Sequence, residues 1–64
     1  MQRHLAIVEL REQALVAREK ASRARRVALR SVGGAGDAFK REASEFDAKA
    51  DRLENQIEAL RAQL

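Results

Sequence analysis

Several residue types are absent from this 64-residue chain or rare in it. It contains no cysteine, proline, tryptophan or tyrosine, and its only aromatic residues are two phenylalanines. Without cysteine, neither a disulfide nor a thiolate-bound metal can stabilise the chain. A domain of this size buries only about 60% of the surface that its unfolded chain exposes. We therefore expect stability to come from association with a second copy or another partner.

Long apolar runs are absent too. No run approaches the roughly 20 apolar residues that span a bilayer, and Met1-Gln2-Arg3-His4 leads into an amphipathic segment without a signal-peptide core. We predict no membrane span and a cytoplasmic location.

The apolar residues that are present fall into two heptad seams, the a and d positions of two long helices. The first seam contains Ile7, Leu10, Ala14, Ala17, Ala21, Ala24 and Ala28. The second contains Phe39, Ala43, Phe46, Ala50, Leu53, Ile57, Leu60 and Leu64. We predict an all-α fold, a two-helix antiparallel coiled-coil hairpin that forms a single domain over 1–64.

Glycines separate the two seams. The stretch Val32-Gly33-Gly34-Ala35-Gly36 predicts helix 1 over about 3–31, a turn over 32–37 and helix 2 over about 38–63. We expect Gly33 to adopt a positive φ and Asp37 to be the N-cap of helix 2.

Charge supports the same pairing. Up to Gly36 the chain has eight basic and three acidic residues, and from Asp37 onward it has five basic and seven acidic ones. Antiparallel pairing brings Arg11, Arg18 and Arg25 alongside acidic residues of helix 2, notably Asp47 and Glu54. Such exposed pairs specify register more than stability.

Helix 1 has apolar residues beyond its seam, at positions that a solvated hairpin would make polar. They are Leu5, Val8, Leu15, Val16 and Leu29. The equivalent positions of helix 2 are Ser44, Glu45, Asp51, Arg52, Asn55 and Glu58. Because a helix that is apolar on two sides is usually buried on two sides, we predict that these five residues bind a partner.

Two alternatives to partner binding remain. The five residues are scattered surface hydrophobics, which need no explanation singly, or they form the seam and the alanines lie outside. The second alternative would bury Glu12, Glu19 and Arg26 without designated partners.

A cationic run is the other candidate surface. Lys20, Arg23, Arg25, Arg26 and Arg30 lie within eleven residues that contain no acid. They are candidate anion-binding residues for the phosphates of RNA, DNA or an anionic membrane. A solvated arginine-rich face is the competing interpretation, because both aromatic residues are on the seam and leave no stacking platform.

No catalytic pattern is present. His4 is the only histidine, and no convergent carboxylate makes it a base or a metal ligand. The run 32–36 lacks the preceding strand and the Gly-Lys-Ser/Thr ending of a phosphate-binding loop. We predict no enzyme activity, cofactor, metal or small-molecule substrate.

In the stretch from Phe46 to Ile57, a small residue, Ala50, follows Phe46 by four positions and is itself followed by Leu53-Glu54. This stretch resembles the YscE/PscE/AscE type of small co-chaperone from type III secretion systems. Chain length, hairpin layout and Gly33-Gly34 near the turn are also similar, while Glu42-Ala43-Ser44 stands where the family often carries a Gln-Tyr-Gln-like element. The resemblance implies a cytoplasmic protein that pairs with a larger helical-repeat chaperone and keeps a needle subunit from polymerising before export.

Two other functions stay open. One is a homodimeric four-helix bundle with a basic helix that contacts RNA or DNA, similar in size and plan to the plasmid Rop type. The other is a structural coiled-coil component of a larger assembly.

Overall fold

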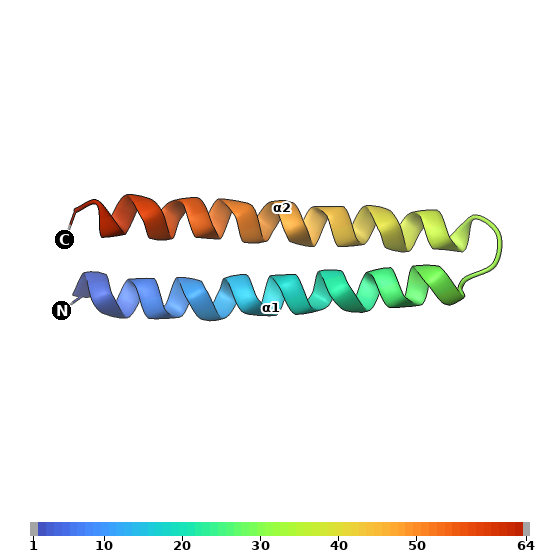
Figure 1. Ribbon diagram of the computed structural model, residues 1–64, viewed down its shortest axis with the longest axis horizontal. Helices are drawn as coiled ribbons and strands as arrows, with labels where there is room; N and C mark the ends of the chain where they lie inside the picture. Colours follow the sequence, from blue (N-terminus) through green and yellow to red (C-terminus); the bar gives the residue numbers. More distant parts are fainter. Residues whose placement is uncertain (1, 64) are drawn as a thin grey trace.

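The computed structural model describes residues 2–63 and consists of two long helices side by side. Helix α1 spans Gln2–Arg30 and helix α2 spans Ala35–Arg61. They run antiparallel, and a short connection closes one end of the rod (Figure 1). The rod measures 49 × 14 × 10 Å. The predicted all-α helical hairpin is therefore confirmed.

The predicted seam forms the core. In α1 the buried residues are Ile7, Ala14, Ala17, Ala21, Ala24 and Ala28. In α2 they are Gly36, Ala43, Ala50, Leu53 and Ile57. Leu10, Phe39, Phe46 and Leu60 are half-buried, and Leu64 lies outside the described residues. Among residues 2–63 no polar or charged residue is buried, as expected when heptad spacing keeps one narrow apolar face toward the partner helix.

Small residues bring the helices close together near the turn. Ala21, Ala24 and Ala43 form a buried cluster against which Phe46 packs. Closer still to the turn, a Cβ atom added to Gly36 would lie 3.2 Å from the carbonyl oxygen of Ala28. The backbones therefore approach closely at this end, where a larger side chain would push them apart.

The turn is shorter than predicted, and the expected N-cap is wrong. Helix α2 begins at Ala35, and its N-cap is Gly34, without a side-chain hydrogen bond. Asp37 lies instead in the first turn of α2, where a carboxylate is favourable beside the positive end of the helix dipole. Helix α2 begins earlier than predicted because of Gly33, which has a φ of +73° as expected. It reverses the chain so early that Gly34 is already helical, with φ −70° and ψ −13°.

Neither helix, over the residues described, combines the length and apolar character needed to cross a lipid bilayer.

Candidate interaction surfaces

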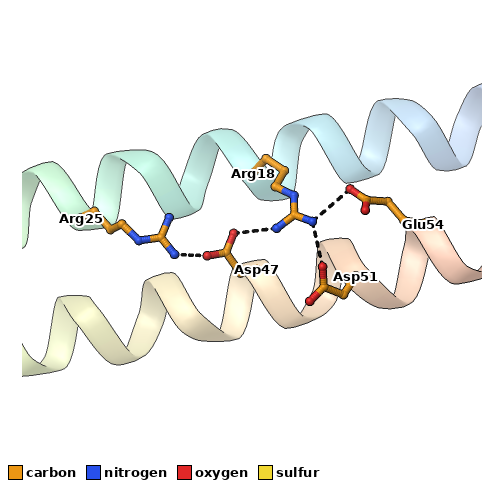
Figure 2. A network of polar contacts seen from close by, with 5 residues as sticks. All are labelled: Arg18, Arg25, Asp47, Asp51 and Glu54. Carbon is orange, nitrogen blue, oxygen red and sulfur yellow. Dashed lines mark hydrogen bonds and ion pairs between the residues drawn. The ribbon is translucent and has the colours of Figure 1, made fainter.

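One flank of the hairpin carries an ionic network that ties the two helices together (Figure 2). Arg18 of α1 donates from Nη1 to Oδ1 of Asp47 at 3.0 Å. Its Nη2 donates to Oδ1 of Asp51 at 2.8 Å and to Oε1 of Glu54 at 3.1 Å. Arg25 donates to the other carboxylate oxygen of Asp47. Asp47 is thus shared by two arginines that lie two helical turns apart on α1.

This network joins the two helices in the register that the sequence predicts. The hydrogen bonds to Asp51 and Glu54 raise the pKa of Arg18 above its ordinary value, since they favour its charged form. The predicted alignment is confirmed for Arg18 and Arg25 with Asp47 and Glu54, whereas Arg11 forms no ion pair within residues 2–63. Asp51 was assigned to the outer surface of α2, but its carboxylate is within reach of the long arginine side chain.

The cationic run does not form one surface. Arg25 is engaged with Asp47, and Nη2 of Arg23 donates to Oε1 of Glu19 at 3.2 Å. Nζ of Lys20 lies 5.6 Å from the ring centroid of Phe46, on the opposite flank. Arg26 and Arg30 are exposed, and within residues 2–63 neither forms an ion pair. Lys20 and Arg25 therefore lie on opposite flanks, whereas Arg23, Arg26 and Arg30, spaced three and four residues apart, share the side of α1 that points away from α2.

The predicted partner-binding residues are all exposed. Their exposed fractions are 61% for Leu5, 50% for Val8, 70% for Leu15, 48% for Val16 and 84% for Leu29. Val8, Leu15 and Leu29 are separated by multiples of seven residues and therefore form one row along α1. Leu15 borders the ionic flank beside Arg18 and Glu54.

Val16 borders the opposite flank. It lines a shallow groove with Lys20 and Phe46, and a second shallow groove, next to the same two residues, is lined by Val27 and Phe39. The sequence analysis missed Val27 because that residue flanks the seam, and it missed Val32 because that residue falls in the turn. Both are exposed in the structure.

The exposed aliphatic side chains are unevenly divided between the helices. All exposed large hydrophobic residues in the described chain are in α1 or at Val32, and none is in α2. We call the residues of α1 that point away from α2, at heptad positions b, c and f, the outer face of α1. From Leu5 onward they are Leu5, Val8, Glu9, Glu12, Leu15, Val16, Glu19, Ser22, Arg23, Arg26, Leu29 and Arg30. Every one of them is exposed.

Comparisons with known protein families, with curated proteins and with solved structures find no significant match. The candidate surfaces therefore have to be interpreted from their own chemistry.

Proposed function

We propose that this protein is a non-catalytic interaction module, which docks a helical partner on the outer face of α1. The observation that carries the proposal is the distribution of side-chain size across α1. Towards α2 this helix buries one isoleucine and five alanines, whereas its outer face exposes the larger Leu5, Val8, Leu15, Val16 and Leu29. In a hairpin that acts alone, the larger aliphatic side chains belong inside.

Burial of this surface contributes free energy of the size that binding requires. Fully burying one Leu or Val side chain contributes about 1.5–3 kcal/mol relative to leaving it exposed. Because the five side chains are between 48% and 84% exposed, burying the rest of their surface contributes roughly 5–9 kcal/mol in total, against an association cost of about 4 to 15 kcal/mol. A helix is the partner that best matches a straight row such as Val8, Leu15 and Leu29, which Ser22 interrupts once.

The test is a double substitution, Val8→Glu/Leu15→Glu, beside a matched control, Ala48→Glu/Ala59→Glu, on the exposed surface of α2. Size-exclusion chromatography, partner capture and circular dichroism are applied to both variants and to the wild type. We expect the first variant to lose assembly and to keep its helicity, because charge at an interface opposes its desolvation. If it keeps the oligomeric state and the partners of the wild type, the proposal is wrong.

The resemblance to type III secretion co-chaperones gives a more specific form of this proposal. In that form the chain acts in the cytoplasm, and the outer face of α1 binds a larger helical-repeat protein that also holds a needle subunit. Its support is the length and layout of the hairpin. Co-expression with such a partner, followed by co-purification of wild type and Val8→Glu/Leu15→Glu, tests it directly.

Nucleic-acid binding is the alternative, and the exposed Arg26 and Arg30 favour it. Acidic residues on the same outer face, among them Glu12 and Glu19, oppose it because they repel phosphates. We expect binding to duplex DNA and to RNA to be weak and to vanish near physiological salt, about 0.15 M. Submicromolar binding at that salt, lost in Arg23→Glu/Arg26→Glu, would replace the docking proposal.

A further inference from the structure

The charges on the outer face of α1 are separated by sign along the helix. The acidic residues Glu9, Glu12 and Glu19 all precede the basic residues Arg23, Arg26 and Arg30. The aliphatic row spans both halves, from Val8 through Leu15 to Leu29. This face is therefore negative at one end, positive at the other, and apolar along one edge.

A surface of this kind is complementary to itself when two copies run antiparallel. With a two-fold axis beside Glu19, Glu12 of one copy lies opposite Arg26 of the other, and Glu9 lies opposite Arg30. The same register places Val8 opposite Leu29, whereas Leu15 lies opposite Ser22, so one apolar pair, formed twice, accompanies the charged pairs. A parallel arrangement would instead place acidic half against acidic half and basic half against basic half, which is repulsive.

Resting on the proposed docking function, we propose that the partner of the outer face of α1 is a second copy of this chain. The two α1 helices pair antiparallel, about a two-fold axis beside Glu19, and the assembly is a four-helix dimer with α2 on the outside of each half. The interface is isologous, so each pair of opposite residues occurs twice.

The two copies of Glu19 meet on the axis as a like-charged pair. Arg23 of each copy lies near them and offsets their repulsion. Its carboxylate already accepts a hydrogen bond from Arg23 of its own helix at 3.2 Å. The antiparallel register brings Arg23 of the second copy within about one helical turn of the same carboxylate. Four charges of alternating sign then surround the axis.

The size of the hairpin limits the interface. The hairpin exposes 4901 Å², and a standard interface takes about 800 Å² from each partner. The side of α1 that points away from α2 is the narrow side of the rod, 49 × 10 Å (Figure 1), so the interface is smaller than the standard size.

Charge reversal tests both the partner and the register. Glu12→Arg and Arg26→Glu each turn two attractive pairs of the dimer into repulsive ones. Sedimentation equilibrium is run on each variant alone, on an equimolar mixture of the two, and on the double variant. Glu45→Arg and Arg52→Glu, which make the same changes on the exposed surface of α2, are the matched controls.

We expect a wild-type dimer whose dissociation constant rises about tenfold or more in each single variant. The mixture and the double variant should recover wild-type affinity. In the heterodimer of the mixture one pair joins the new arginine at position 12 to the new glutamate at position 26 and the other is the wild-type pair, and in the double variant both pairs are exchanged. The two controls should remain as dimeric as the wild type.

Three results would overturn the inference. A monomeric wild type that binds another protein through Val8 and Leu15 excludes self-pairing and leaves the docking function standing. A monomer in which Val8→Glu/Leu15→Glu changes nothing removes both proposals. A dimer that the single charge reversals do not weaken, or that the mixture does not restore, excludes this antiparallel register.

Discussion

Replacing Ala21 with leucine should show directly which face of α1 is inside the hairpin. Ala21 is fully buried, and it packs with Ala24 and Ala43 in the cluster that also contacts Phe46. A leucine adds three carbon atoms where the two backbones lie close together. The helices then have to separate, or the new side chain has to leave its preferred rotamer.

Overpacking of this kind costs about 1–3 kcal/mol. For a domain of 60 to 100 residues, each kcal/mol corresponds to a shift of about 4–8 °C in Tm. A cost near 2 kcal/mol therefore predicts a Tm lower by about 8–16 °C. The assay is thermal unfolding followed by circular dichroism at 222 nm, with all proteins at one concentration because association also raises Tm.

The matched control is Ala48→Leu, which makes the same change at an exposed position of α2. Helix propensity changes equally in both variants, so the difference between them isolates packing. We expect Ala48→Leu to stay within about 0.5 kcal/mol of the wild type. If Ala21→Leu is neutral or stabilising while Ala48→Leu is destabilising, the seam has been assigned to the wrong faces.

Two further predictions concern the turn and the ionic flank. Gly33→Ala should destabilise the hairpin by about 1–2 kcal/mol, because the φ of +73° at this position disfavours any Cβ. Gly34 is already helical, and a Cβ added to it would meet no atom within 4 Å. Gly34→Ala should therefore be neutral or stabilising by up to about 1 kcal/mol. Equal urea midpoints for these two variants would contradict the assignment. Asp47→Asn should lower Tm at low salt and lower it less in 1 M NaCl, because salt screens the ion pairs that the substitution removes. The control Glu45→Gln, on the exposed surface of α2, should leave Tm unchanged at both salt concentrations. An equal decrease in Tm at low and high salt for Asp47→Asn would mean that Asp47 acts through something other than its ion pairs.

The seam could be predicted from the sequence because helix geometry defines the candidate faces and charge decides between them. Residues spaced alternately three and four apart share one face of a helix, whatever surrounds them. For this reason the buried alanines of α1, and the burial of Leu53 and Ile57, follow from spacing and charge before any packing is known. Gly33 was also predictable, because glycine is the residue that best tolerates a positive φ.

Other features depend on details that spacing does not contain. Asp37 has good N-cap chemistry, but the early reversal at Gly33 lets Ala35 begin the helix first. Asp51 joins Arg18 because an arginine side chain reaches past the position directly opposite it. The cations of residues 20–30 are close together in the sequence, yet the helix places Lys20 and Arg25 on opposite flanks and the other three on the outer face. Its members therefore differ in their partners, as Arg25 and Lys20 show.

Both faces of α1 are apolar enough to pack, so the choice of the inner face has to come from charge. Turning Leu5, Val8, Leu15 and Leu29 inward would gain at most about 1.5–3 kcal/mol each. The same rotation would expose Ile7 and the alanines, and it would bury Glu12, Glu19 and Arg26, at several kcal/mol for each unpaired ion. The loss exceeds the gain, and the structure accordingly buries no charged residue among those it describes. On the outer face the same three charges are solvated, and in the proposed dimer they favour the antiparallel orientation over the parallel one.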